Sequence, residues 1–340
     1  MAPKVFLTGG TGYIGGSVLH TLVTAHPEYD ITVLLRKTPD AFTSTYPNIK
    51  IVKGDYDSAD ILSEQASKAD IVVHNGDSDH EPSLNALIAG LVKKSTPAHL
   101  LHLSGTGIVS DWSSPDYLGT LNPKVWSDLD DLPSISSLPD HALHRNTEKI
   151  LFKTATEHGD KLKLAIMCPP DIYGKGTGLG KTSSVFAPMF IRDLRTSGNR
   201  PFFYREGTNT RSWVHISDLM QVYLKVVEAA VSRDENFGWN KEGYYFAGTQ
   251  EHSHLAVART IGSILKKHGV IEEGELVQVT LEQIDETAKH PRFPQLGRYL
   301  YASNSRTRPK RAQELFGYTA RAPGLLESLE EDVLAALERS

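Results

Sequence analysis

The amino-acid sequence predicts an α/β fold, a doubly wound parallel sheet with a smaller C-terminal substrate lobe. In the first half of the chain, short aliphatic runs alternate with helix-like stretches, and these runs are nearly all apolar instead of alternating between polar and apolar positions. Such runs are typical of parallel strands that helices cover on both faces. The length of 340 residues corresponds to about two domains, or to one large α/β unit with an embedded lobe.

Six strands separated by helices are expected in the first half, as successive βαβ units. The strand-like runs are Lys4–Thr8, Asp30–Leu35, Ile49–Lys53, Ile71–His74, Leu100–Ser104 and Lys163–Cys168. The second half is less regular. It contains a short strand leading into a helix, a second helix, and a C-terminal segment with apolar residues at helical spacing, which are Trp213–Ala230, Leu255–Lys267 and Gly324–Arg339.

Composition and charge exclude several classes of protein. The 36 basic and 41 acidic side chains leave a net charge of −5, so the chain has no overall positive field for nucleic acid. The single cysteine, Cys168, excludes an intramolecular disulfide and a cysteine-based zinc site. No apolar run approaches the roughly 18 residues of a membrane span. The first run, Val5–Leu7, soon meets Gly9, which argues against a signal peptide. We expect a cytoplasmic protein with a small-molecule substrate.

A glycine-rich turn follows the first predicted strand and precedes a helix-like stretch. It fits both G-x-G-x-x-G and T-G-x-x-G-x-x-G. Glycine allows a tight turn, close approach of the backbone to a pyrophosphate, and close packing of helix on strand, while the helix N-terminus offers free N–H groups to the anion. The turn therefore predicts a dinucleotide site formed by Thr8, Gly9, Gly10, Thr11, Gly12, Tyr13, Ile14 and Gly15.

The end of the second predicted strand indicates which dinucleotide is preferred. An acidic residue there would accept hydrogen bonds from the ribose hydroxyls of NAD, but the sequence has Arg36 and Lys37. A guanidinium pairs with a 2′-phosphate, so NADP(H) is predicted over NAD(H). The alternative is a solvated basic pair at a strand end. Asp55 and Tyr56, just past the third strand, are expected to border the adenine.

Further motifs resemble the extended type of short-chain dehydrogenase/reductase, the group that includes nucleotide-sugar epimerases and dehydratases and many carbonyl reductases. Beyond the glycine turn, the motifs that carry the resemblance are Gly54-Asp55, His74-Asn75-Gly76, Leu103-Ser104-Gly105-Thr106, the segment from Cys168 through Pro169 and Ile172 to Gly174, and the segment from Arg211 to Leu219. The resemblance implies a Rossmann NADP-binding domain over residues 1–173, to which residues 211–231 return. Residues 174–210 and 232–340 would then form the substrate-binding lobe.

The resemblance also implies individual roles. Asn75, Gly76, Pro169 and Ile172 would contact the cofactor, and a homodimer is an option because the family commonly forms dimers. Members usually protonate a carbonyl oxygen with a tyrosine from a Y-x-x-x-K pair, while a Ser or Thr after the fifth strand hydrogen-bonds the carbonyl. Ser104 and Thr106 are available for the second role.

The tyrosine of that pair is missing here. Aligned from Glu148, the tyrosine and lysine positions fall on Asp140 and His144, and no tyrosine lies between Tyr117 and Tyr173. Two interpretations remain open. In one, the chain is an atypical enzyme that uses another acid: His144, His141, Tyr117 or Tyr173. In the other, it is a catalytically silent NADP(H)-binding redox sensor that reports cofactor state to a partner.

Three residues are candidates for contact with the substrate. Arg211 occupies the place of an arginine that holds the diphosphate in nucleotide-sugar enzymes of the family, although it could instead fix its own strand. Lys175 belongs to a glycine-rich loop, Gly174–Lys181, expected as a flexible lip of the substrate pocket. Tyr117 is the third. The segment from His74 to Glu81 contains possible metal ligands, but solvated loop carboxylates explain it better, and no metal is predicted.

Overall fold

The main sheet has seven parallel strands in the order β11-β7-β5-β4-β1-β2-β3. The computed structural model describes residues 2–291 and 293–338. The predicted doubly wound α/β fold is confirmed, and the six expected strands lie within a residue or two of their predicted positions. The strands are β1 (Lys4–Thr8), β2 (Asp30–Leu35), β3 (Lys50–Lys53), β4 (Ile71–His74), β5 (Ala98–Leu103), β7 (Leu162–Cys168) and β11 (Tyr244–Phe246).

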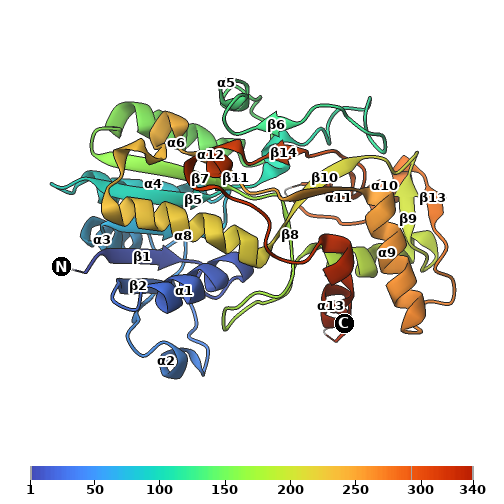
Figure 1. The fold of residues 1–340 in the computed structure, drawn as a ribbon, viewed down its shortest axis with the longest axis horizontal. Helices are drawn as coiled ribbons and strands as arrows, with labels where there is room; N and C mark the ends of the chain where they lie inside the picture. The colour runs from blue at the N-terminus through green and yellow to red at the C-terminus, as the bar shows by residue number, and fades with distance from the viewer. Residues whose placement is uncertain (1, 292, 339–340) are drawn as a thin grey trace.

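Helices cover both faces of this sheet, as the apolar runs require (Figure 1). Along β1, Val5 and Leu7 face one core and Phe6 faces the other, which is the period-two alternation of a strand buried on both sides. One face carries α1 (Tyr13–Ala25) and α8 (Ile216–Ser232), and the other carries α3 (Ala59–Lys68), α4 (Glu81–Val92) and α6 (Arg145–His158). Shorter elements complete this part: α2 (Phe42–Thr45), η1 (Thr106–Val109), α5 (Leu132–Ile135), η3 (Glu235–Phe237), η4 (Asn240–Glu242) and α12 (Lys310–Phe316).

A second, smaller lobe lies at the other end of the molecule (Figure 1). It has its own apolar core and a three-stranded sheet in the order β12-β10-β8. Its strands are β8 (Asp171–Tyr173), β10 (Thr210–His215), β12 (Gln250–Ser253) and the separate pair β9 (Phe202–Tyr204) with β13 (Val277–Val279). A further pair, β6 (Trp126–Ser127) with β14 (Thr307–Arg308), packs through Trp126 on the core of the main sheet. The helices of the lobe are α7 (Phe186–Asp193), η2 (Leu194–Ser197), α9 (His254–Lys267), α10 (Leu281–Glu286), α11 (Leu296–Tyr301) and α13 (Leu325–Leu337).

The two parts are interleaved along the chain. Helix α8 packs against α1, as expected for a returning segment, but β10 just before it belongs to the sheet of the lobe. Strand β11 lies in the range 232–340, which the sequence places in the lobe, yet it pairs with β7 at the edge of the main sheet. The sequence-based division therefore differs from the structure at β11, because a three-residue strand carries too little pattern to be detected.

Candidate active site

The glycine turn joins β1 directly to α1. Gly9 has φ +76°, and a Cβ there would collide with the carbonyl oxygen of Asn75. A Cβ on Gly15 would likewise collide with the carbonyl oxygen of Gly9. The Gly12 N–H donates to the Gly9 carbonyl at 2.8 Å, which closes the turn before α1 begins. Because these positions are glycines, no side chain fills this space. The backbone N–H groups of the turn and the N-terminus of α1 are therefore open to a bound anion.

A cavity of about 740 Å³ opens over this turn. It lies at the carboxyl ends of β1 to β4, where ligands bind in open α/β sheets. The predicted cofactor residues that line it are Gly9, Thr11, Gly12, Tyr13, Ile14, Gly15, Arg36, Lys37, Asp55, Tyr56, Asn75 and Gly76. Four others do not line it. Gly10 packs beneath the turn against Val33, buried Thr8 contacts His74 Nδ1 through its hydroxyl at 2.6 Å, and Pro169 and Ile172 lie apart from the cavity.

Two polar details of the cavity wall fit a dinucleotide. Asn75 accepts a hydrogen bond from the Tyr223 hydroxyl at 2.7 Å through Oδ1, whereas its buried Nδ2 has no partner among the described residues. A buried amide N–H₂ without an acceptor is costly, so a ligand acceptor is expected there. The Tyr56 ring lies against Gly76, where a Cβ would be only 2.7 Å from ring carbons, so the missing side chain makes room for the ring. The cavity residues therefore fit an adenine nucleotide joined to a pyrophosphate.

Residues 174–182, which we call the strap, lie across the glycine turn. The Tyr13 hydroxyl donates to the Gly174 carbonyl at 2.6 Å, and the Lys181 N–H donates to the Thr11 carbonyl at 2.9 Å. Gly178 packs directly on Gly16, where a Cβ would be only 2.7 Å away. The loop was expected as a flexible lip of the substrate pocket; instead, backbone contacts hold it on the turn and place Lys181 in the cofactor cavity.

The two positions that replace the tyrosine and lysine of the family are not neighbours on one helix. Helix α6 begins only at Arg145, and His144 caps it with φ 64°, in the left-handed region. Asp140 lies on the exposed turn before it and pairs with Lys149 at 2.8 Å. Y-x-x-x-K brings its residues together only when both lie on one helix face. Asp140 therefore has no access to the site.

His144 does reach the site. Its Nδ1 lies 2.8 Å from Asp79 Oδ1, and its Nε2 lies 3.0 Å from where a Cβ on Gly105 would be, next to Ser104. Burial alone would lower the pKa of His144, but the hydrogen bond and charge of Asp79, with the charge of Glu148, outweigh burial and raise it. The hydrogen bond and charge of Asp79 thus favour the protonated imidazole, with Nε2 toward the loop after β5.

Ser104 is turned into the protein interior. Its hydroxyl donates to Glu148 Oε1 at 2.6 Å, and the Tyr244 hydroxyl donates to the same oxygen at 2.9 Å. Burial raises the pKa of Glu148 to about 7, although both hydrogen bonds lower it. The expectation that Ser104 donates to a substrate therefore needs correction, because its proton is already used. Thr106 is also buried, and its carbonyl accepts from Ser305 at 2.7 Å.

Three other candidate acids do not gather around the cavity. The hydroxyl of buried Tyr173 donates to the Pro323 carbonyl at 2.7 Å and accepts from Gln250 at 2.6 Å, so it is bound to the lobe on the side of α13. His141 is exposed and packs edge-on against Trp112, and Tyr117 is exposed on a loop.

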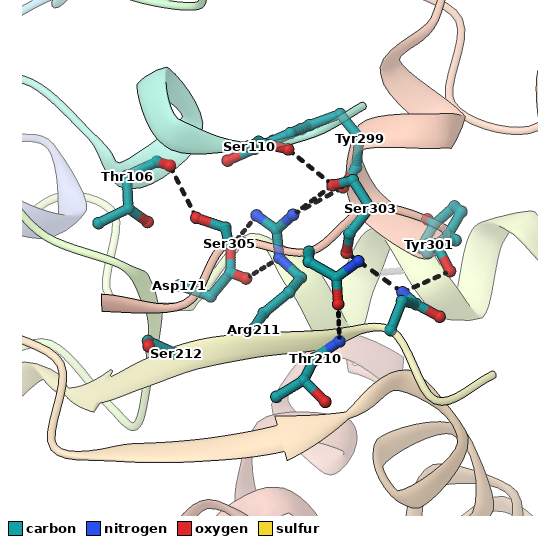
Figure 2. Close-up of polar contacts among 12 residues, drawn as sticks. Thr106, Ser110, Asp171, Thr210, Arg211, Ser212, Tyr299, Tyr301, Ser303 and Ser305 are labelled. Carbon is teal, nitrogen blue, oxygen red and sulfur yellow. Dashed lines mark hydrogen bonds and ion pairs between the residues drawn. The ribbon is translucent and has the colours of Figure 1, made fainter. Parts of the chain in front are cut away.

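Arg211 is engaged within the protein (Figure 2). Its side chain is 4% exposed, and its Nε lies 2.5 Å from Asp171 Oδ2. Nη1 donates to the Tyr299 carbonyl at 2.7 Å and to Ser303 Oγ at 3.0 Å, and the guanidinium carbon lies 4.4 Å from the centre of the Tyr299 ring. The guanidinium thus serves to fix β10 to β8 and α11. Lys175 is also misplaced for a substrate contact, since it lines a groove between α1 and α8.

Sequence reasoning did not point to Tyr299, which lies beside Gly107, and it expected Lys181 of the glycine-rich loop at the substrate pocket, whereas Lys181 lines the cofactor cavity. A Cβ on Gly107 would lie 3.2 Å from the Tyr299 hydroxyl. Tyr299 belongs to no local motif, so no pattern in the chain could have connected it to the site.

Neither a membrane span nor a metal cluster is found in residues 2–291 and 293–338. None of their helices is both long and apolar enough to cross a bilayer. The same part of the chain has no group of three His, Cys, Asp or Glu side chains arranged to hold a metal ion.

The sheet, the glycine turn and the cavity define a dinucleotide-binding Rossmann protein of the extended short-chain dehydrogenase/reductase type. Models of an NAD(P)H-binding domain and of the NAD-dependent epimerase/dehydratase family match residues 9–131 and 140–240. Oxidase ucsJ of Acremonium sp is 30% identical over 353 residues, which cover 100% of this chain and 99% of that protein. The chain therefore belongs to the NAD-dependent epimerase/dehydratase family.

More distant relatives agree with this assignment. A dTDP-glucose 4,6-dehydratase of Mycobacterium tuberculosis is 25% identical over 275 residues, 76% of each chain. The crystal structure of a dTDP-glucose 4,6-dehydratase from Bacillus anthracis in complex with NAD covers 99% of this chain and 97% of its own, with a TM-score of 0.65 at 15% identity. At this identity the likeness establishes the fold.

Proposed function

We propose that the protein is an NADP(H)-dependent oxidoreductase that acts on a small carbonyl compound. The observation that carries the cofactor preference is the pair Arg36 and Lys37, which line the cavity at the end of β2, where no carboxylate is available to a ribose diol. A guanidinium there can pair with a 2′-phosphate through charge-assisted hydrogen bonds.

The bound cofactor supplies a hydride to the substrate carbon. The glycine turn offers N–H groups to the pyrophosphate, and Lys181 adds a positive charge at the cavity wall. Asn75 lines the same cavity, and its buried Nδ2, which has no partner among the described residues, is a donor that the cofactor could engage. His144 stands where the family has its lysine, and we assign its imidazole, fixed by Asp79, to orienting the nicotinamide ribose.

A carbonyl compound without a diphosphate is the favoured substrate, although several relatives are named for nucleotide sugars. Arg211, the residue expected to hold a diphosphate, is buried and neutralised by Asp171. Beside it, Trp112 and Phe293 pack edge-on with ring centres 4.9 Å apart, and Phe293 approaches Tyr299 at 6.0 Å. An aromatic cluster joined through Tyr299 to an arginine already paired with Asp171 suits an uncharged, apolar substrate better than a dianion.

Calorimetry with NADPH and NADH tests the cofactor assignment. Wild-type protein should bind NADPH more tightly, and Arg36→Glu should weaken NADPH binding about tenfold, since a charge-assisted hydrogen bond at an exposed site is worth about 1.5 kcal/mol. Arg195→Glu, an exposed arginine of the lobe, is the matched control for the charge change. Equal affinities of the wild type for both cofactors would contradict the assignment.

Turnover is tested by following NADPH oxidation through its absorbance at 340 nm. The test substrates are ketones, aldehydes, enones, imines and nucleotide sugars. Reduction of any uncharged carbonyl class supports an oxidoreductase. NADPH binding with no turnover in every class, combined with an NADPH-dependent change in affinity for a protein partner, would favour the sensor that the missing Tyr–Lys pair also allows.

A further inference from the structure

Most buried tyrosines of this protein use their hydroxyl proton internally. Seven of them donate to an acceptor within the described chain: Tyr13, Tyr173, Tyr223, Tyr244, Tyr245, Tyr301 and Tyr318. Their acceptors are backbone carbonyls, side-chain carboxylates and an amide oxygen. A hydroxyl bound in this way has no proton to give to a substrate.

Tyr299 is placed differently. Its ring lies against the guanidinium of Arg211, whose carbon is 4.4 Å from the ring centre, and Arg211 Nη1 donates to the Tyr299 backbone carbonyl (Figure 2). The seven donating hydroxyls named above do not include that of Tyr299, so its proton is not committed to an acceptor within residues 2–291 and 293–338. Arg211 is itself fixed by Asp171 at 2.5 Å. A fixed cation therefore lies against the ring of Tyr299.

The Tyr299 hydroxyl also reaches the correct stretch of backbone. It lies 3.2 Å from the position of a Cβ on Gly107, in η1 directly after β5, and the Leu143 side chain lies 3.1 Å from the same position. From the other side, His144 Nε2 approaches Gly105. Tyr299 from α11 and His144 from the start of α6 thus converge on the loop after β5, the part of the fold that carries Ser104 and Thr106.

We propose that Tyr299 is the proton donor of this protein, recruited from the C-terminal lobe in place of the missing tyrosine, with Arg211 as its cationic partner. This inference rests on the proposed carbonyl reduction. The π pair of the carbonyl becomes the new O–H bond, formed with the proton that leaves Tyr299 Oη. The carbon receives the hydride that the cofactor supplies. Arg211 stabilises the phenolate that remains, and water returns the proton.

The charges around Tyr299 are consistent with an acid. Burial raises its pKa, the charge of Arg211 and its hydrogen bond lower it, and Asp171 raises it again, with a net upward shift. The phenol is therefore protonated at neutral pH. Activity limited by this group should persist well above pH 7, whereas a histidine donor would lose activity as the pH rises through its own pKa.

The decisive variant is Tyr299→Phe, which keeps the ring on Arg211 and removes only the hydroxyl. With the carbonyl compound identified by the NADPH panel, kcat should fall by roughly 10²- to 10⁴-fold while the NADPH dissociation constant changes less than about twofold. Tyr204→Phe is the matched control, since Arg205 lies 5.6 Å from the centre of that ring in another part of the lobe. It should retain full turnover.

A second readout does not need a substrate. In the NMR spectrum of protein labelled with [13Cζ]tyrosine, the signal that disappears in Tyr299→Phe is assigned to Tyr299. The chemical shift of this signal should change when NADP⁺ is added, and that of Tyr204 should not. A stationary Tyr299 resonance overturns the inference, as does full turnover by Tyr299→Phe. If no carbonyl class is reduced, the proposed function fails, and the resonance still decides whether Tyr299 faces the cofactor.

Discussion

Replacing Glu148 with glutamine should remove one large pH-dependent contribution to the stability of this protein. Glu148 is fully buried beneath Ser104, and burial raises its pKa from 4.5 to about 7 against the hydrogen bonds of Ser104 and Tyr244. The shift of about 2.5 units corresponds to roughly 3 kcal/mol at about 1.4 kcal/mol per unit.

The direction in which stability changes with pH depends on whether the folded or the unfolded state holds the proton of Glu148. Between pH 4.5 and 7 the folded protein keeps the proton of Glu148, whereas the unfolded chain has lost it. The contribution to stability is therefore complete below the unfolded pKa and is lost as the pH rises through the folded pKa. Above pH 7 the folded state holds a buried carboxylate, and the full penalty of roughly 3 kcal/mol applies.

Urea unfolding from pH 4.5 to 8.5 measures this effect. The wild type should lose roughly 3 kcal/mol more than Glu148→Gln over this range. The variant also has a constant cost, because its amide N–H₂ replaces Oε2, which has no partner in the described residues. Glu157→Gln, on the exposed side of the same helix, is the control and should follow the wild type. Two parallel stability curves for wild type and Glu148→Gln would refute the reasoning. Asp128, also raised to a pKa of about 7 by burial, contributes equally to both proteins.

Two further changes probe the cofactor side of the site. Gly9→Ala should abolish measurable NADPH binding in calorimetry, because the residue needs a positive φ and its Cβ would meet the Asn75 carbonyl; binding within twofold of wild type would contradict the geometry described for the turn. His144→Ala should weaken NADPH binding and also remove its pH dependence above the ordinary histidine range, since the hydrogen bond and charge of Asp79 raise the pKa of the imidazole. An unchanged pH dependence of the NADPH dissociation constant in His144→Ala would exclude the imidazolium from the cofactor site.

The sequence predicts the main sheet and the glycine turn well because both depend on residues that are close together in the chain. Apolar runs mark strands buried on both faces, and the turn needs only its own glycines and a following helix. Arg36 is found in the cavity for the same reason, since it directly follows β2. Strand β11 is missed because it consists of three residues at a sheet edge.

The chemistry of the site depends on contacts that the chain order conceals. Tyr299 meets Gly107 only through the docking of the lobe, and the strap brings Lys181 to the turn through glycine contacts that no motif specifies. The direction of Ser104 is decided by Glu148 from a different element. In each of these cases, tertiary packing and not local pattern determines which group faces the cavity.

The return of the chain from the lobe to the main sheet limits how this protein can be divided or recombined. Helix α8 covers α1, and β11 pairs with β7 at the edge of the sheet. Both α8 and β11 are synthesised long after the elements that they cover. A nascent chain that has reached only residue 173 would expose the apolar face of α1 and an open strand edge, the features that favour aggregation. Chimaeras with relatives should therefore exchange α8 and β11 together with the first 173 residues.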